Sequence, residues 1–366
     1  MKRVVSLLTI LFLALTVGGF TSEASEFTFA VEPIIPDNQI DKNQTYYDLK
    51  LTPGQKEELA VNLRNDTDND VKVGVGINSA TTNVNGVVEY GKNEIKPDKT
   101  LTYNIKDLVD YPDEITIPKH SEKELKLTVQ MPNKEYTGLI AGGITFQEIK
   151  DEKAEKAEAN DQGLAIKNEY SYVVALLMRQ TTDNGAPDLK LNSVKAGQLN
   201  FRNTILANLQ NPNPTYLNSM TTEAKVTKKG EDKALYEVKK NSMQMAPNSN
   251  FDFPISLDGK PLEAGDYHFH AVVYGQLDDK GEYVYGKDKD GNDVHYRYQW
   301  TLDKDFSIAG EVAKKLNDKD VTIKKDYTWI YILIGILLLL LLLLILFIVK
   351  RRKDEKRKKD EEQTQA

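Results

Sequence analysis

Residues 71–77 read VKVGVGI, and residues 124–129 read ELKLTV. In both stretches apolar residues alternate with polar or small ones, which is the pattern of a half-buried β-strand. The same alternation appears at residues 58–63 (ELAVNL) and 267–272 (YHFHAV). These stretches predict strands with one face in a core and the other in solvent.

Clusters of Gly, Asn, Asp and Pro separate the predicted strands, at residues 65–70, 83–86, 211–214, 278–281 and 288–292. These residues favour tight turns because they accept left-handed backbone or satisfy turn amides with their side chains. Short strands punctuated by such turns are typical of antiparallel sandwiches. We therefore predict an all-β fold of two tandem immunoglobulin-like β-sandwiches, followed by one C-terminal transmembrane helix.

The chain contains a candidate internal repeat. One alternating strand ends in NLRN at residues 62–65, and a later one ends in NLQN at residues 208–211. Tyr136 and Tyr267 each stand just before a later strand, a position that resembles the tyrosine corner of immunoglobulin-like domains. We interpret the two halves as copies of one sandwich layout; the alternative is chance similarity between β-rich segments.

Charged residues 150–163 look like a linker, but apolar strand-like stretches flank them on both sides. We interpret this segment as an extended loop inside the first sandwich, because the stretch after it supplies a closing strand. The polar turn TTDNGAP at residues 181–187 is a better boundary. The predicted domains are therefore 27–181 and 187–308, followed by a polar stalk at 309–328.

The C-terminal region carries an uninterrupted apolar stretch from Trp329 to Val349, followed at once by KRRK. About 20 apolar residues suffice for a helix to cross a bilayer, and Lys/Arg clusters mark the cytoplasmic side. We predict a transmembrane helix at 329–349 and a basic cytoplasmic tail at 350–366. The N-terminal charged and apolar segment, ending in small residues, predicts a signal peptide at 1–24. The expected location is the cell membrane, with a single pass and the ectodomain outside.

Composition limits the classes of partner and chemistry. The formal net charge is −7, and both ends of the chain are net positive, so the predicted ectodomain is more acidic still. An acidic ectodomain does not favour a nucleic-acid partner, which needs a basic face. The chain has no cysteine, which excludes thiol catalysis and cysteine-based metal sites. We expect no cofactor.

No catalytic motif is present, since the sequence lacks the nucleophile elbow, the zinc-protease helix motif and the P-loop. His268 and His270 share one strand face and either hold a metal with a third ligand or form a solvent-facing pair. Residues 288–293 (DKDGND) resemble a calcium loop but fail the EF-hand spacing, and Asp290-Gly291 fits a hairpin turn. Acidic residues are plentiful, but nothing selects a pair for glycoside cleavage.

Residues 81–90 (TTNVNGVVEY) form the best candidate binding segment. Amides beside an aromatic ring suit a sugar or a peptide, because amides bond to hydroxyls and the ring packs against C–H groups. The candidate ligand-binding residues are Asn83, Asn85 and Tyr90. The alternative is a plain turn, since Asn85-Gly86 is also a hairpin signal.

Several segments resemble a known family, the WxL-interacting proteins of Gram-positive bacteria. The segments similar to the family's first domain are FAVEPIIPDNQ (29–39), YYDLKLTPGQ (46–55), VNLRNDTDNDVKVGV (61–75), SATTNVNGVVEY (79–90) and YTGLIAGGITF (136–146). Those similar to its second domain are PDLKL (187–191), ANLQNPNPTYL (207–217), MQMAPNSNFDFPI (243–255) and AGDYHF (264–269).

The resemblance implies a peptidoglycan-binding first domain and a second domain that contacts host or other extracellular proteins, both immunoglobulin-like. It implies a membrane-anchored surface adaptor that is not an enzyme. Its partners would be peptidoglycan, a secreted WxL-domain protein and a host extracellular-matrix protein. Two alternatives remain open from the residues: a cell-wall-active enzyme, and a chaperone that binds exported subunits by strand addition at a sheet edge.

Overall fold

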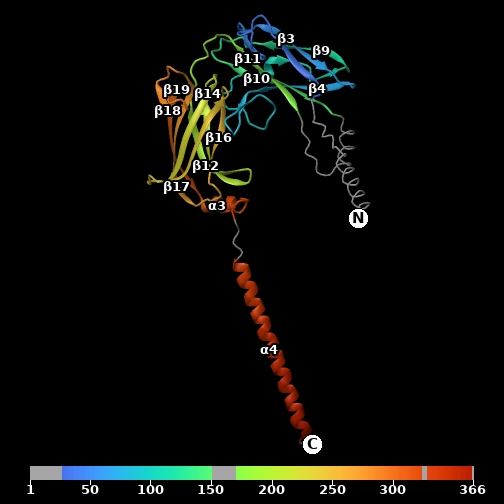
Figure 1. Ribbon diagram of the computed structural model, residues 1–366, viewed down its shortest axis with the longest axis vertical. Coiled ribbons are helices and arrows are strands. Elements are labelled where there is room, and N and C mark those ends of the chain that lie inside the picture. Colours follow the sequence, from blue (N-terminus) through green and yellow to red (C-terminus); the bar gives the residue numbers. More distant parts are fainter. Residues whose placement is uncertain (1–26, 151–169, 324–327, 365–366) are drawn as a thin grey trace, which may run out of the picture.

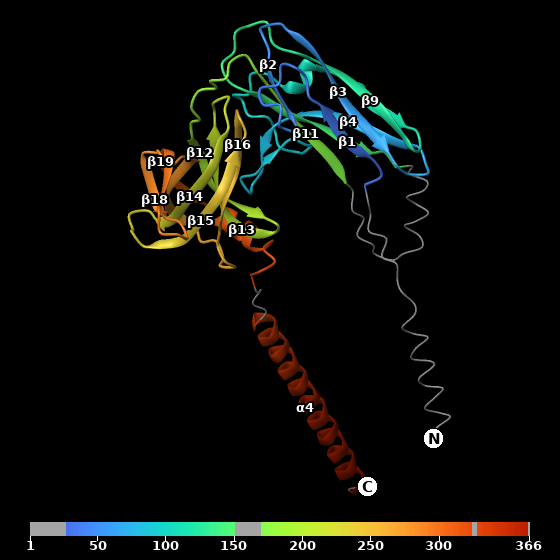
Figure 2. The same cartoon turned by 45° about the horizontal axis from the view of Figure 1, so that its top comes forward.

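The structure is a computed structural model that describes residues 27–150, 170–323 and 328–364. Two β-sandwiches lie at an angle to each other, and a long helix projects below the second (Figure 1). Turned towards the viewer, the first sandwich lies across the upper end of the second (Figure 2). The predicted signal peptide and most of the predicted loop at 150–163 lie outside the described residues.

The first sandwich packs a four-stranded sheet against a five-stranded one. The four-stranded sheet has the order β1 (Ala30–Ile34), β3 (Lys56–Asn65), β9 (Ser121–Gln130), β7 (Val109–Asp110). The five-stranded sheet has the order β2 (Tyr47–Lys50), β11 (Ser171–Arg179), β10 (Ile140–Glu148), β4 (Val71–Ser79), β8 (Glu114–Ile117). Only the β2–β11 pair in these two sheets is parallel.

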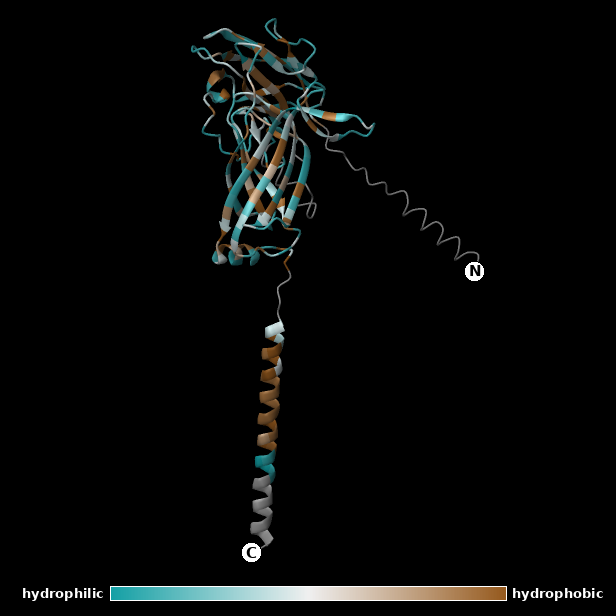
Figure 3. Cartoon of the chain, turned by 90° about the vertical axis from the view of Figure 1, so that its left-hand side faces the viewer, coloured by the Kyte–Doolittle hydropathy of each residue, from teal (hydrophilic) through white to brown (hydrophobic). Residues whose placement is uncertain are grey.

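The alternation read from the sequence gives this core. On β3, Leu59, Val61 and Leu63 are buried, and on β4 Val73 and Ile77 are buried. These side chains meet between the sheets in one apolar cluster. Strand colours alternate accordingly between apolar and polar residues (Figure 3).

Between β4 and β8 the chain leaves the sheet. It forms a small hairpin, β5 (Thr81–Thr82) with β6 (Val88–Glu89), then a loop and a short 3-10 helix, η1 (Ile105–Leu108). This excursion, residues 80–108, lies on the side of the first sandwich that faces the second, and it builds most of the contact described below.

The second sandwich packs a three-stranded sheet against a five-stranded one. The first has the order β12 (Lys190–Leu199), β13 (Arg202–Asn211), β16 (Ser249–Ser256). The second has the order β15 (Ala234–Met245), β14 (Leu217–Lys228), β17 (Gly265–Leu277), β19 (Asp293–Ile308), β18 (Tyr283–Lys287). Its core includes Phe253, Phe269 and Leu209. The predicted all-β architecture is confirmed.

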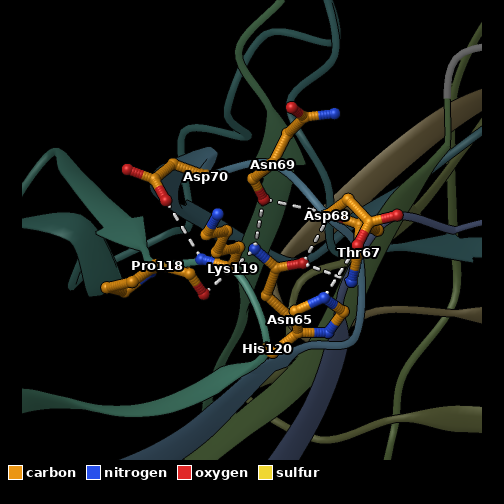
Figure 4. Close-up of polar contacts among 8 residues, drawn as sticks. All are labelled: Asn65, Thr67, Asp68, Asn69, Asp70, Pro118, Lys119 and His120. Carbon is orange, nitrogen blue, oxygen red and sulfur yellow. Dashed lines mark hydrogen bonds and ion pairs between the residues drawn. The ribbon is translucent and has the colours of Figure 1, made fainter.

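The Asn that ends each NLxN motif has the same role in both sandwiches. Asn65 is fully buried at the end of β3, and its Nδ2 donates to the carbonyls of Asn69 and Pro118 at 2.8 and 3.2 Å (Figure 4). The same Nδ2 donates to the carbonyl of Ile117 at 3.0 Å. Its Oδ1 accepts from the backbone N–H of Thr67 at 2.9 Å. We call this arrangement the asparagine corner: one amide ties together the turn after its own strand and the turn before the neighbouring strand.

Asn211 repeats the corner at the end of β13. Its Nδ2 donates to the carbonyls of Thr215 and Ala246, at 2.7 and 3.2 Å, and it too is fully buried. The turn before the neighbouring strand also matches, because His120 and Asn248 both have φ of 49°. The internal repeat is therefore confirmed at this corner.

The two tyrosines differ. Tyr267 donates to the carbonyl of Glu263, four residues upstream, at 2.9 Å, which is the bond of a tyrosine corner. Tyr136 instead packs edge-on against Tyr103, with ring centroids 5.3 Å apart, and burial raises its pKa to about 12.

The segment expected to be a stalk begins with a helix, α3 (Gly310–Asn317), that packs on the second sandwich. Ala313 is buried, and Asp320 just beyond accepts from the backbone N–H of Asn203 at 2.6 Å. Helix α4 (Thr328–Thr364) then carries the apolar stretch, visible as a continuous apolar segment (Figure 3). Residues Thr328–Lys353 form one helical stretch that is long and apolar enough to cross a membrane.

Candidate functional site

The two sandwiches are joined by a small apolar cluster. Ala80, Leu139 and Leu177 of the first sandwich pack with Ala246 of the second, flanked by Tyr90 and by Tyr216 from opposite sides of the junction. Tyr90 and Tyr216 also share a hydrogen bond between their hydroxyls at 3.1 Å. Burial raises the pKa of both tyrosines, so this bond is between neutral hydroxyls at neutral pH.

Backbone groups cross the same junction. The N–H of Gln244 donates to the carbonyl of Gly86 at 2.7 Å, so the tip of the β5–β6 hairpin extends the end of β15. The N–H of Leu139 donates to the carbonyl of Pro214, also at 2.7 Å. Backbone bonds of this kind fix the relative position of two domains more closely than exposed side chains can.

The second asparagine corner forms part of the junction. The hydroxyl of Ser249 lies 2.7 Å from that of Thr82, and the Thr82 hydroxyl accepts from the N–H of Ala246 at 2.9 Å. Asn248 donates to the carbonyl of Pro212 and contacts the hydroxyl of Thr100. Hydrogen bonds therefore join the turn before β16 to the first sandwich.

Asp98 is the most connected charged group of the junction. Its carboxylate accepts from Gln210 at 2.8 Å, from Asn250, and from the backbone and hydroxyl of Thr100. Burial alone raises the pKa of Asp98, but these hydrogen bonds outweigh it and hold the pKa below the ordinary 3.8. The buried carboxylate is therefore ionised and fully occupied at neutral pH.

Two connected cavities of about 150 and about 640 Å³ open along this contact, and we call them together the junction groove. The polar residues that line it are Asn78, Ser79, Thr81, Thr82, Asn93, Lys96, Asp98, Lys99, Asn104 and Lys106 from the first sandwich, and Asn192, Asn208, Gln210, Asn248, Ser249, Asn250 and Asp252 from the second. The groove is thus walled mainly by amides and hydroxyls, with lysines on one side.

Side chains on the second sandwich's wall are linked in a row. Asn192 donates to Asn208 at 2.9 Å, and Asn208 donates to Asn250 at 3.0 Å and to Asp252 at 2.8 Å. We call these four residues the amide row. On the opposite wall, Asn78 keeps a buried Nδ2 that has no hydrogen-bond partner among the described residues. Buried donors of this kind are rare and indicate a site that a polar ligand or water satisfies.

The three residues predicted from the sequence lie in or beside this junction, but their side chains do not face one common site. Asn83 uses its side chain inside the hairpin, accepting from the N–H of Asn85 at 2.8 Å and donating to Glu89 at 2.6 Å. Asn85 is exposed at the hairpin tip. Tyr90 bonds to Tyr216 across the junction. From the same segment, Thr81 and Thr82 line the groove.

Sequence reasoning missed the amide row because its residues are distant along the chain. A signal was nevertheless present, since Asn208 and Asn250 both fall in segments that resemble the family's second domain. Polar residues at alternate positions of a strand, as in Asn250 and Asp252, mark a solvent-facing side. What the sequence does not give is the neighbouring strand, which places Asn208 opposite Asp252 and within hydrogen-bond reach of Asn250.

A second concavity lies on the five-stranded sheet of the second sandwich, and we call it the tyrosine cleft. Tyr285 and Tyr296 line it, together with Ser219, Thr221, Glu223, Lys239, Asn241, Ser242, Gln244, Leu277, Gly286, Lys287 and Val294. The hydroxyl of Tyr285 donates to Glu223 at 2.7 Å, and the Lys239 ammonium lies 4.6 Å from the Tyr285 ring centre.

The backbone around the tyrosine cleft is unusual. Ser219, Ser242 and Gln276 lie on three adjacent strands and take left-handed φ of 49°, 57° and 61°. Register shifts on β14 and β15 accompany the first two. Non-glycine residues seldom adopt this conformation, and such bulges gather where a sheet is bent to form a site.

The remaining polar candidates have structural partners. His268 and His270 contact Asp303 and Asp305 on the neighbouring strand, with the shortest distances at 2.7 Å. Asp288 closes its hairpin by accepting from the backbone N–H of Asp290 and Asn292. Within the described residues, no group of three or more His, Asp or Glu side chains is placed to hold a metal ion.

The chain thus combines two tandem immunoglobulin-like sandwiches, a polar groove between them and one apolar helix. The chain belongs to the WxL Interacting Protein family: residues 29–148 match the model of its peptidoglycan binding domain, and residues 161–318 match that of its host binding domain. These are families of binding domains, not of enzymes. No curated protein sequence matches the chain.

Solved structures with similar folds include pilus chaperones. The chaperone–tip adhesion subunit complex CsuC–CsuE of Acinetobacter baumannii is 14% identical, covering 75% of this chain and 98% of that one, with a TM-score of 0.30. The class 5 fimbriae chaperone CfaA is 13% identical, covering 74% and 99%, with a TM-score of 0.28. The E. coli chaperone DraB is 16% identical, covering 77% and 98%, with a TM-score of 0.26.

Proposed function

We propose that the chain is a single-pass membrane adaptor that binds peptidoglycan and holds a secreted WxL-domain protein, or a host matrix protein, at the cell surface. The observation that carries this proposal is the joining of two binding domains into one body by direct contacts, above one helix long enough to span a bilayer. Two sites on one body are what an adaptor requires.

The proposed orientation places the sandwiches outside the cell. Trp329 and Tyr331 stand at the end of α4 nearest the sandwiches, where aromatic rings favour the headgroup zone. The Lys350–Lys353 cluster stands at the other end and favours the cytoplasm. A signal peptide at 1–24, cleaved on export, completes this topology.

We assign peptidoglycan to the junction groove. Peptidoglycan is rich in amides and hydroxyls and carries carboxylates, and the groove offers neutral amides and hydroxyls with lysines on one wall. The first sandwich supplies the lysines and the orphaned amide of Asn78, in agreement with a peptidoglycan-binding first domain.

We assign the protein partner to the tyrosine cleft. Its charges are already paired, Glu223 with Lys239 at 3.3 Å and Lys287 with Asp293 at 2.9 Å. Leu277 at its rim is 56% exposed. Exposed aliphatic and tyrosine side chains beside paired charges are typical of protein-binding surfaces.

A bridging experiment tests the proposal. The full chain in detergent micelles is mixed with purified peptidoglycan and a purified WxL-domain protein, and the pellet is analysed. We expect the WxL-domain protein to sediment only when the chain is present. Equal sedimentation without the chain, or a chain that stays in the supernatant, contradicts the proposal.

Three variants separate the two sites. Asn93→Ala/Asn250→Ala should abolish sedimentation of the chain itself. Leu277→Asp/Tyr285→Ala should leave the chain in the pellet and release the WxL-domain protein. Glu282→Gln, an exposed change outside both sites, should behave as the parent.

A further inference from the structure

The junction groove distinguishes between the two chemical parts of peptidoglycan, its glycan strands and its peptide stems. Sugar sites commonly offer exposed aromatic faces for C–H packing. Among the described residues that line the groove, Phe251 is the one aromatic residue, and only 3% of its surface is exposed. The groove therefore lacks the feature that favours a pyranose ring.

The amide row instead suits a peptide. Primary amides carry both donors and acceptors, so they can bond to the N–H and the carbonyl of a peptide backbone alike. Asn192, Asn208 and Asn250 hold one another in place through their own hydrogen bonds. Their orientation is thus fixed before a ligand arrives, which lowers the entropic cost of binding.

Charge in the groove is arranged for an anion. The carboxylates of Asp98 and Asp252 are both engaged, Asp98 by the bonds described above and Asp252 by Asn208 and by Lys195 at 3.4 Å. Lys96 and Lys99 line the other wall, and neither takes part in an ion pair among the described residues. Two cations are therefore available to a ligand's carboxylate. The groove's own carboxylates already have partners: Asp98 stays ionised but accepts hydrogen bonds from Gln210 and Asn250, and Asp252 accepts from Asn208 beside Lys195.

We infer that the junction groove binds the peptide stem of peptidoglycan through the stem's free carboxylate, with Lys96 and Lys99 as its cationic partners and the amide row along its backbone. This inference rests on the proposed peptidoglycan function and narrows its substrate class to a carboxylate-ended peptide.

Calorimetry with three soluble probes tests the inference on the full chain in micelles. The probes are a diacetylated Lys-D-Ala-D-Ala peptide, the same peptide with an amidated C-terminus, and an N-acetylglucosamine oligomer. We expect the free acid to bind, amidation to weaken binding roughly ten-fold through the loss of charge-assisted hydrogen bonds, and the oligomer not to compete.

Variants of Lys96 and Lys99 test whether these lysines bind the carboxylate, because a lysine with only a structural role would not change the preference for the acid over the amide. Lys96→Met/Lys99→Met should bind the acid and the amide equally, at the parent's affinity for the amide. Lys92→Met, an exposed lysine of the same excursion outside the groove, should keep the parent's preference. A parent that binds acid and amide equally, or that binds the oligomer and not the peptide, overturns the inference.

The outcomes separate this inference from the proposed function. If the chain sediments with peptidoglycan but none of the peptides binds, the stem assignment is wrong and the adaptor proposal stands. If the chain does not sediment with peptidoglycan, both are wrong.

Discussion

The two asparagine corners make the same hydrogen bonds in different surroundings. Asn65 closes a turn at the free end of the first sandwich, beside exposed Asp68 and Asp70 (Figure 4). Asn211 closes the matching turn of the second sandwich, but that turn lies against the first sandwich through Ser249 and Asn248. The repeated residues thus set the local geometry, while their surroundings decide whether a corner is only structural or also part of a site.

Replacing the corner asparagine with alanine should give the largest difference in stability between the two corners. Asn211→Ala leaves the carbonyls of Thr215 and Ala246 without their donor at a contact that water does not readily reach, and we expect a loss of about 3 kcal/mol. Asn65 is also buried, but its turn carries the exposed Asp66, Asp68 and Asp70, so water can reach the freed carbonyls of Asn65→Ala more readily, and we expect about 2 kcal/mol. Thermal unfolding followed by circular dichroism measures both variants, and the fluorescence of Trp300, the one tryptophan outside α4, gives a separate signal for the second sandwich.

Binding to peptidoglycan through the junction groove serves as the second measurement on these two variants. Asn211→Ala should also weaken binding to peptidoglycan, because Ser249 and Asn250 follow the altered turn, whereas Asn65→Ala should not. Equal losses of stability and equal binding in the two variants would mean that the surroundings of the corner do not matter.

A glycine at the junction tests how closely the second corner is held. Gly138 has φ of 122°, and an added Cβ would lie 2.6 Å from the carbonyl oxygen of Pro214. Gly138→Ala should therefore break the Leu139–Pro214 bond and loosen the junction, at a cost of about 2 kcal/mol. Because the chain has no cysteine, spin labels on Asp66→Cys and Lys233→Cys can measure the distance between the sandwiches.

We expect a broader distance distribution in Gly138→Ala than in the parent. Gly185, between the sandwiches, has φ of 74° with no atom near its missing Cβ, so Gly185→Ala matches the backbone strain without the clash. An unchanged distribution in Gly138→Ala, or one equally broadened in Gly185→Ala, contradicts a closely packed junction.

Acid should affect the second corner through Asp98, which holds Asn250. The folded-state pKa of Asp98 is depressed below 3.8, so its stabilisation is present above that value and is lost as the pH falls through the folded pKa. We expect the label distances of the parent to broaden below about pH 4. In Asp98→Asn the distance distribution should be broad already at neutral pH and should not broaden further in acid. If acid broadens it as much as in the parent, the change is due to another carboxylate.

We expect the smallest effect from exchanging the two residues that hold the left-handed position in each corner, His120 and Asn248. His120→Asn should change stability by less than about 0.5 kcal/mol, because asparagine accepts φ of 49° at least as well as histidine. Asn248→His should cost more, since it loses the bond to the carbonyl of Pro212. Thermal unfolding of both variants measures this; a larger loss in His120→Asn would show that the contact of His120 with Asp68 stabilises the first corner.

Much of the fold follows from alternation and turn residues. Val71, Val73, Val75 and Ile77 are buried as their period of two predicts, and the NLxN repeat marks equivalent corners. Helix α3 is not predicted, because its eight residues are polar around Ala313 and Leu316 and gain their stability from packing on the second sandwich.

The candidate site is harder to predict from the sequence than the fold. The Thr81–Tyr90 segment lies at the junction, and its Thr81 and Thr82 line the groove that we propose as the binding site. The groove itself depends on contacts between residues more than a hundred positions apart, such as Asp98 with Gln210. No local pattern specifies which polar strand faces meet, because that is decided by how two separate cores pack together.

The docking of α3 has a mechanical consequence. In the proposed adaptor, tension between cell wall and membrane enters the second sandwich from α4. From α4 the chain leads back through Val321, Asp320 and α3 into β19 of one sheet, while Asp320 and Val321 are bonded to Asn203 and Phe201 at the β12–β13 turn of the other. A pull is therefore shared between both sheets at once, and the hydrogen bonds around α3 must shear before the load can peel β19 from its neighbours.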